Sequence, residues 1–242
     1  MRKAFLLLAV VALAIPVMAA QIVAVDTGPL QFAGNHGSAS ASRDCIDYTV
    51  YDNTVNGPTA VFSQNPGAYI ADELVLDMTQ APPGYNILSD LSFSVYNSST
   101  ATATLGVTSM EISIADANWS YVWDYVFSMD LGLPPGYYET IDLTGLCSLG
   151  IVLPDDIIIG LQVYGAAGTL PGQVVMNPPT IGSSTNDFYL DNTVATPPGT
   201  VNGWRWFGST GPVANFYWGV SVCPEPTSLL LIAGGLLLRR RR

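Results

Sequence analysis

Most of the side chains in this sequence that could carry chemistry are carboxylates. His36 is the only histidine, and a Ser-His-Asp triad would have to use it. Its neighbours are small and polar, so we expect a loop there and no triad. Glycoside hydrolysis needs two carboxyl groups across a cleft, and the glutamates before the C-terminal tail are Glu73, Glu111 and Glu139. The sequence does not show which carboxylates face one another, so we expect each to be solvated.

Calcium binding is the chemistry that the acidic residues favour more. Ca²⁺ takes about six to eight oxygen ligands and tolerates irregular loops. We take Asp187 and Asp191 as candidate ligands of a structural calcium ion. The alternative is ordinary turn chemistry, because Asp and Asn often cap turns. The remaining candidate pairs, none of which fits an EF-hand loop, are Asp44 with Asp47, Asp72 with Glu73, and Asp155 with Asp156.

The densest aromatic stretch of the chain is Gly-Trp-Arg-Trp-Phe at residues 203–207. In a strand, Trp204 and Trp206 share one face and Arg205 lies on the other. Two tryptophans on one face are typical of a core, since aromatic side chains dominate buried area. The alternative is a sugar-binding surface, with the rings stacking on sugars and Arg205 bonding hydroxyls.

The cysteines are Cys45, Cys147 and Cys223, an odd number. In an oxidising compartment one bridge can form among them. We predict Cys45 with Cys147, which leaves Cys223 free. Cys147 with Cys223 is the main alternative. Their wide spacing does not fit a local zinc site.

Short strand patterns separated by turn residues recur along the whole body of the chain. Leu91, Phe93 and Val95, for example, alternate with polar residues, as in a half-buried strand. The repeated Pro-Pro-Gly-Tyr at residues 82–85 and 134–137 predicts two equivalent turns. The triple isoleucine at 157–159 predicts burial on both faces. We therefore predict an all-β fold, a jelly-roll-like β-sandwich of about a dozen short strands.

The net charge of the chain is −11. Six of its eight basic residues lie in the two terminal segments, which leaves Arg43 and Arg205 in the body. All but one of the 19 acidic residues precede Pro224. A body this acidic repels nucleic acid, whose binding depends on neutralising phosphates. Cations, neutral polymers and basic surfaces are the partners that remain, and solubility is the simplest reason for the charge.

The N-terminal segment has the layout of a secretory signal peptide. Arg2 and Lys3 precede an apolar run from residue 4 to 15, and small residues follow before Gln21. We expect cleavage near Ala19 or Ala20. The sequence therefore predicts a signal helix at residues 1–20 and one sandwich domain at residues 21–222.

The C-terminal segment, residues 223–242, reads CPEPTSLLLIAGGLLLRRRR. Pro224 and Pro226 end the preceding strand because they fix φ and lack a backbone donor. A helix over residues 227–238 would span roughly 18 Å, against roughly 30 Å of bilayer hydrocarbon. The helix is short for a permanent transmembrane span. Arg239, Arg240, Arg241 and Arg242 would hold its end on the cytoplasmic side.

This order of elements resembles the C-terminal sorting signal of the PEP-CTERM family of bacterial proteins. Pro224, Glu225 and Pro226 match the recognition motif of that family, residues 229–238 its apolar segment, and residues 239–242 its basic stop. The resemblance implies recognition by an exosortase, a membrane-embedded processing enzyme, after transient insertion in the inner membrane. Residues 133–164 and 182–192 also resemble the bodies of planctomycete members. The apolar run is shorter than usual, and Cys223 replaces a small or aliphatic residue.

We therefore expect a non-enzymatic protein, exported to the cell surface or the extracellular matrix, that needs no cofactor. The alternative is a carbohydrate-binding module that recognises extracellular polysaccharide through exposed aromatic residues. A glycan-active hydrolase is the third interpretation. An exposed Trp204 or Trp206 would favour the carbohydrate-binding module. Two carboxylates about 5 to 10 Å apart in a cleft would favour the hydrolase.

Overall fold

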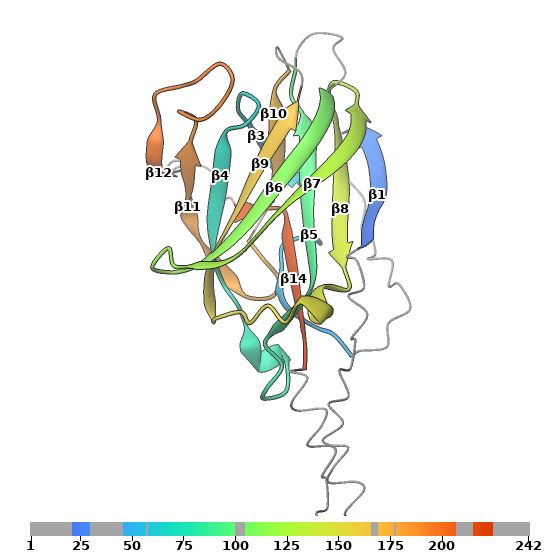
Figure 1. The fold of residues 1–242 in the computed structure, drawn as a ribbon, viewed down its shortest axis with the longest axis vertical. Helices are drawn as coiled ribbons and strands as arrows, with labels where there is room; N and C mark the ends of the chain where they lie inside the picture. Colours follow the sequence, from blue (N-terminus) through green and yellow to red (C-terminus); the bar gives the residue numbers. More distant parts are fainter. Residues whose placement is uncertain are drawn as a thin grey trace, which may run out of the picture.

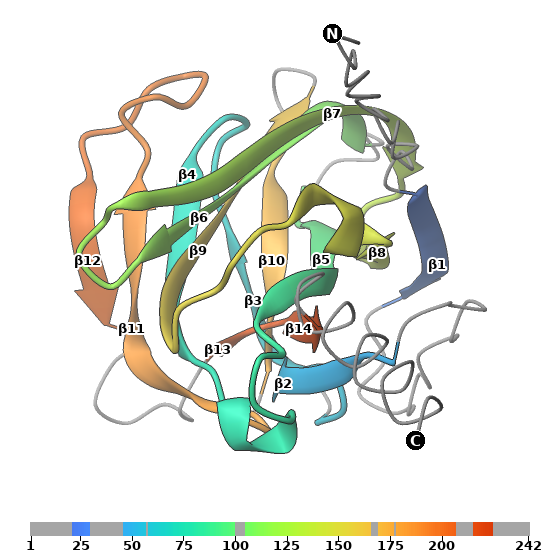
Figure 2. The ribbon, with the colours of Figure 1, turned by 60° about the horizontal axis from the view of Figure 1, so that its bottom comes forward.

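The chain folds into two antiparallel β-sheets that face each other, as Figures 1 and 2 show. This computed structural model describes residues 21–29, 46–56, 58–99, 105–165, 169–176, 178–206 and 215–224. Fourteen strands and two short 3₁₀ helices lie in these ranges. The prediction of an all-β sandwich is confirmed.

The first sheet, sheet A, has eight strands. Its central strand β5 pairs with β8 on one side and with β14 and β10 on the other. The members of sheet A are β1 (Gln21–Pro29), β2 (Tyr48–Asp52), β3 (Pro58–Ser63), β5 (Ile87–Asn97), β8 (Tyr137–Thr144), β10 (Pro171–Met176), β13 (Asn215–Phe216) and β14 (Trp218–Cys223).

The second sheet, sheet B, has six strands in the order β12-β11-β4-β9-β6-β7. The strands are β4 (Tyr69–Val75), β6 (Leu105–Asp116), β7 (Tyr121–Leu133), β9 (Asp156–Gly165), β11 (Ser183–Asp191) and β12 (Asn202–Trp206). The two 3₁₀ helices, η1 (Met78–Gln80) and η2 (Leu146–Leu149), lie in connections between strands.

The strand pairs are nested in the sequence. β6 pairs with β7, β5 with β8, β4 with β9, and β3 with β10, always antiparallel. Successive pairs alternate between sheet B and sheet A. A long hairpin therefore folds back and forth between the two layers, and residues far apart in sequence become neighbours.

The core lies between the sheets and follows the alternation of the sequence. Met110, Ile112 and Ile114 of β6 are fully buried, whereas the residues between them are partly exposed. The triple isoleucine of β9 is buried throughout, including Ile158, which is 2% exposed. The predicted burial on both faces is confirmed, so something must also cover the outer face of sheet B at this point.

The repeated Pro-Pro-Gly-Tyr forms two equivalent turns, as predicted. In both, the tyrosine N–H donates to the carbonyl of the first proline, at 3.1 Å for Tyr85 and 3.2 Å for Tyr137. The glycines, Gly84 and Gly136, have φ of 84° and 82°. Proline followed by glycine at positive φ is the signature of a type II turn, so the repeat reflects local turn chemistry.

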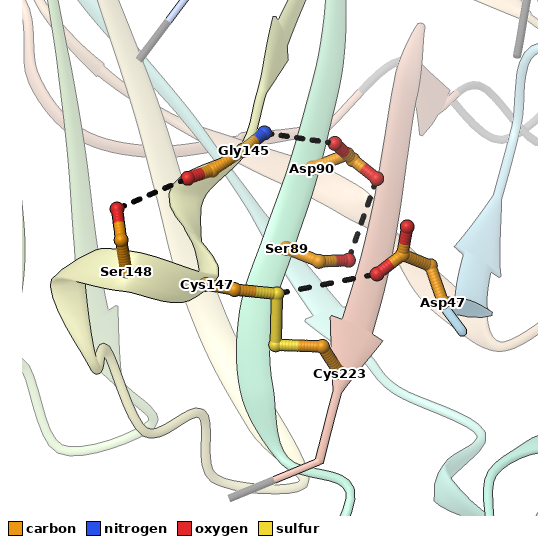
Figure 3. The surroundings of a disulfide bond; sticks show 7 residues. All are labelled: Asp47, Ser89, Asp90, Gly145, Cys147, Ser148 and Cys223. Atoms are coloured by element: carbon orange, nitrogen blue, oxygen red, sulfur yellow. Dashed lines mark hydrogen bonds between the residues drawn. A yellow bond between two sulfur atoms is a disulfide. The ribbon is translucent and has the colours of Figure 1, made fainter. Parts of the chain in front are cut away.

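The one disulfide of the described residues joins Cys147 in η2 to Cys223 at the end of β14 (Figure 3). The predicted Cys45–Cys147 pairing is therefore wrong, because Cys147 has its partner, and the alternative is correct. β14 pairs with β5, and η2 packs against the same strand, which brings the two Cα atoms to 6.3 Å. Asp90 of β5 accepts from Gly145 N at 3.3 Å and so holds the start of η2. Cys45 lies outside the described residues.

No helix in the described part of the chain is long and apolar enough to cross a membrane. The predicted signal helix at 1–20 lies outside the described residues, and so do His36 and residues 225–242. These last include Glu225, Pro226, the apolar segment and the four arginines. Of the sorting motif the structure describes only Pro224, which is buried.

Candidate functional site

Trp204 lies on the outer face of sheet B, away from the core. On β12 it pairs with Tyr189 of β11, while the next residue, Arg205, pairs with Phe188. Phe188 is buried between the sheets, so the side of β12 that carries Trp204 faces outward. Its side chain is 37% exposed. Of the two interpretations of this stretch, burial in the core is wrong for Trp204.

Trp204 belongs to a group of three rings at this surface, which we call the aromatic cluster: Trp119, Tyr189 and Trp204. Trp119 and Trp204 are exposed, and Tyr189 is partly exposed. The ring centroids of Trp119 and Tyr189 are 4.8 Å apart, and each lies 6.0 Å from that of Trp204. All three pairs meet edge to face, an arrangement that aromatic rings prefer. The cluster is therefore a fixed surface feature formed by three different segments.

Trp119 reaches the cluster because the β6–β7 hairpin bends over the sheet. Figures 1 and 2 show its end sweeping across β4 and β11 toward β12. Trp119 lies in the turn of this hairpin and is 43% exposed.

The turn holds Trp119 in a conformation that tryptophan rarely adopts. Its φ is 63°, and it is the only described residue other than glycine with a positive φ. Asp116 stabilises the turn, since its Oδ1 accepts from the N–H groups of Asn118 at 2.9 Å and Ser120 at 2.8 Å. The left-handed region is costly for a bulky residue and is most often seen at functional sites.

A second tyrosine, Tyr69 of β4, supports the cluster from the sheet surface. Its ring centroid lies 6.1 Å from that of Tyr189. The ring lies over Gly160 of β9, where any Cβ would overlap it. Its hydroxyl shares a 2.8 Å hydrogen bond with Ser113 Oγ of β6. Gly160 therefore allows Tyr69 to lie flat across three strands, and burial raises its pKa.

Tyr189 is fixed by a short chain of hydrogen bonds. Its hydroxyl donates to Asn202 Oδ1 at 2.5 Å, and Asn202 Nδ2 donates to Asp191 Oδ2 at 3.1 Å. The other oxygen of Asp191 accepts from Thr193 N at 2.9 Å and from its hydroxyl at 2.6 Å. Asp191 thus orders the loop after β11 and orients the ring.

The candidate calcium ligands are not brought together. Asp187 and Asp191 lie four residues apart on the same strand, which separates their Cα atoms by roughly 13 Å. Both oxygens of Asp191 already accept hydrogen bonds within its own loop and from Asn202. Among the described residues no group of three or more His, Cys, Asp or Glu is arranged to hold a metal ion.

Arg205 does not join the aromatic cluster. It lies on the opposite side of β12, and its Nη1 donates to the backbone carbonyl of Trp204 at 3.3 Å. Arg205 is therefore not beside the rings, where it would bond the hydroxyls of a sugar stacked on them. The backbone of Trp206 pairs with Asp187, whereas its side chain lies outside the described part of the structure.

The three glutamates do not share one face. Glu73 and Glu111 alternate with core residues of β4 and β6 and so point outward, and Glu111 Oε2 accepts from the Tyr164 hydroxyl at 3.3 Å. Glu139 is buried between the sheets, where burial raises its pKa. Burial also raises the pKa of Glu73, and the nearby carboxylates of Asp187 and Asp156 raise it further.

Sequence reasoning identified Trp204 and missed Trp119, Tyr189 and Tyr69. Tyr189 had a usable signal, because it sits between Phe188 and Leu190 and must face away from them in a strand. Trp119 had none, since its contact depends on how the hairpin bends. Tyr69 is recognisable only once Gly160 is known to lie beside it.

No known protein-family model matches this chain, and no curated protein sequence is significantly similar to it.

Proposed function

We propose that this protein is an exported, non-enzymatic β-sandwich protein of the cell surface or extracellular matrix that binds carbohydrate. The observation that carries the binding proposal is the aromatic cluster. Trp119 and Trp204 remain 43% and 37% exposed, although both have large apolar surfaces that a purely structural contact would bury. Clustered, exposed aromatic residues are typical of binding surfaces.

The chemistry around the rings suits a sugar. Aromatic faces pack against the apolar faces of sugar rings, while polar groups beside them bond the hydroxyls. Asn202 next to Tyr189 supplies such groups, because its exposed amide has a second N–H and a second lone pair beyond the bonds to Tyr189 and Asp191. The rings are held in place before binding, by hydrogen bonds for Tyr189 and by the turn for Trp119, which reduces the entropy lost on association.

We propose further that the sandwich is a jelly roll. The nested pairs β3–β10, β4–β9, β5–β8 and β6–β7 support this, because they alternate between the sheets as a folded double-stranded ribbon does. The resulting orders, β3-β10-β5-β8 and β4-β9-β6-β7, are those of eight strands wound in this way. Jelly rolls are frequent among lectin domains.

The export proposal rests on the two terminal segments, with processing by an exosortase-type enzyme at Pro224, Glu225 and Pro226. The Cys147–Cys223 disulfide supports it, since stable disulfides form mainly in exported proteins. The intact mass of the protein from its native host tests this proposal. We expect a chain that lacks residues 1 to about 20 and the tail after the motif. A mature chain that retains Arg239 to Arg242 would overturn the processing proposal.

Binding is tested by sedimentation of the protein with insoluble polysaccharides and by titration with soluble oligosaccharides. We expect Trp204→Ala and Trp119→Ala each to weaken binding by about tenfold or more, since such anchors contribute about 2 kcal/mol. Tyr125→Ala is the matched control. Tyr125 is 40% exposed, but it pairs with the core residue Ile112 and so lies on the inner side of β7. Equal losses in all three variants would contradict the assignment to the cluster.

A hydrolase is the second candidate, favoured by Glu73. Its raised pKa beside Asp187 and Asp156 fits a general acid with neighbouring carboxylates. Release of reducing ends from the bound polysaccharide, abolished in Glu73→Gln without loss of binding, would establish this alternative. Bound polysaccharide that stays intact favours the non-enzymatic proposal.

A further inference from the structure

We propose that the glycan recognised by the aromatic cluster carries free amino groups, so that its sugars are protonated amino sugars. This inference rests on the proposed carbohydrate binding and specifies its ligand class. It follows from the charges that accompany the rings.

The rings on β11 and in the hairpin turn both have carboxylates beside them. Asp187 and Asp191 flank Tyr189 on the same strand, two residues away on either side, and therefore on the same outer face. Asp116 lies in the turn that presents Trp119. The oxygens of Asp116 and Asp191 that accept hydrogen bonds do so from neutral donors, namely backbone amides, a hydroxyl and an amide side chain.

No cationic side chain of the described residues faces these carboxylates. Arg205 is the only lysine or arginine in the ranges that the structure describes. It lies on the other side of β12 and bonds the Trp204 carbonyl. Glu73 of β4 and Asp156 of β9 alternate with core residues and so lie on the same outer face as Asp187. With no described lysine or arginine on that face to offset them, these carboxylates give it a negative potential.

An ammonium group suits both features. A cation is attracted to the faces of tryptophan and tyrosine rings, and tryptophan is the strongest partner. It is also attracted by carboxylates within a Debye length, about 10 Å at 0.1 M salt. A neutral sugar gains only the packing and hydrogen bonds, and an anionic sugar is repelled. The surface therefore selects among glycans by charge as well as by shape.

The test compares three hexasaccharides with the same β-1,4 linkage, made of glucosamine, N-acetylglucosamine or glucose. Each is titrated into the full-length protein by calorimetry, at a pH at which the glucosamine amines are protonated. We expect the glucosamine hexamer to bind about tenfold more tightly than the other two at low salt. We expect the preference to shrink in about 1 M salt, where screening is short-ranged.

The possible results distinguish failure of the amino-sugar inference from failure of the proposed carbohydrate binding. Equal binding of all three sugars, or a preference for an uncharged one, overturns the amino-sugar inference and leaves carbohydrate binding intact. Failure of all three, together with the insoluble polysaccharides, overturns carbohydrate binding itself. A polylysine peptide is the charge control. If this peptide binds as tightly as the glucosamine hexamer, the surface recognises positive charge alone, and the proposal that its ligand is a glycan is wrong.

Substitutions test which carboxylates act. Asp187→Asn should weaken binding of the glucosamine hexamer several-fold more than binding of the N-acetylated hexamer, because it removes charge from beside Tyr189. Asp155→Asn is the matched control. This substitution removes the same charge, but from an exposed residue that precedes β9 and lies outside the aromatic cluster. A parallel loss for both sugars in Asp187→Asn would show a structural role and contradict the inference.

Discussion

Among single residues, Gly160 shows most clearly why its position requires glycine. Its lack of a side chain lets the Tyr69 ring lie across the sheet and reach Ser113. Nothing in the sequence around Gly160 marks it, because the residue that needs the space lies on the neighbouring strand β4. Close approach between strands of this kind depends on register, which single-sequence patterns do not specify.

We expect Gly160→Ala to displace the Tyr69 ring and to weaken glycan binding. The Cβ would overlap the ring, and overpacking of this kind costs about 1–3 kcal/mol of stability. Urea denaturation and oligosaccharide titration measure the two effects. Gly106→Ala is the control, since its Cβ would meet no atom within 4 Å. In a Tyr69→Ala background, Gly160→Ala should cost little, and an undiminished cost there would disprove the contact.

Asp72 is a buried carboxylate that links the two sheets. Its oxygens accept from Ser184 Oγ at 2.9 Å and from Phe216 N at 3.2 Å. Burial raises its pKa from 3.8 to about 7, since these hydrogen bonds only partly offset the lost hydration. The folded chain therefore keeps this proton to a higher pH than the unfolded chain does.

The pH dependence of stability follows from this difference. Between the two pKa values, 3.8 and about 7, the folded state binds more protons than the unfolded state. The free energy of unfolding therefore falls as the pH rises through this window and is level above it. Urea denaturation at several pH values measures the slope, and Asp72→Asn should reduce it. An unchanged slope in this variant would contradict the assignment, since Glu73 and Glu139 would then account for all of it.

Among the elements, the β6–β7 hairpin has the most consequence for function. Strands in this part of the chain were expected, because short strand patterns recur along the whole body of the sequence. The bend that carries Trp119 onto β11 and β12 was not, because it arises from sheet twist and tertiary contact. The same holds for Trp204, whose strand was predicted while its exposure was left open between two interpretations.

The left-handed conformation of Trp119 gives a test at this scale. Glycine adopts a positive φ without cost, whereas alanine does not. We therefore expect Trp119→Gly to be more stable than Trp119→Ala by about 1 kcal/mol. Both variants lack the indole and should lose glycan affinity equally. Thermal denaturation together with titration measures both quantities, and equal stability of the two variants would show that the turn relaxes.

For the whole molecule, the sequence predicted the layered β architecture well, because alternation and turn residues are local signals. The disulfide pairing, in contrast, does not follow from local signals. Spacing alone left Cys45 and Cys223 as rival partners of Cys147. The choice depends on tertiary packing, because η2 and β14 both lie against β5 and this brings Cys147 and Cys223 together. The aromatic cluster likewise combines three segments that no local pattern connects.

The bridge should make a measurable contribution to stability. It closes a sequence separation of 76 residues, and linking positions this far apart contributes about 2–5 kcal/mol. We expect the double variant Cys147→Ala with Cys223→Ala to unfold at lower urea concentration, while Cys45→Ala changes little. Thiol titration of the unreduced, unfolded protein should find one free cysteine. Three free thiols would contradict the bridge.

The position of that bridge also determines how the domain would respond to mechanical force. β14 runs between β2 and β5 inside sheet A, and Cys223 is its last residue. A pull on the chain beyond Cys223 passes at once to Cys147 and so to the segment that follows β8. The strand cannot be peeled from its end one hydrogen bond at a time, because tension is shared between two attachment points. A domain tethered through its C-terminal side would thus pass load to two places in the fold, β14 and the connection that follows β8.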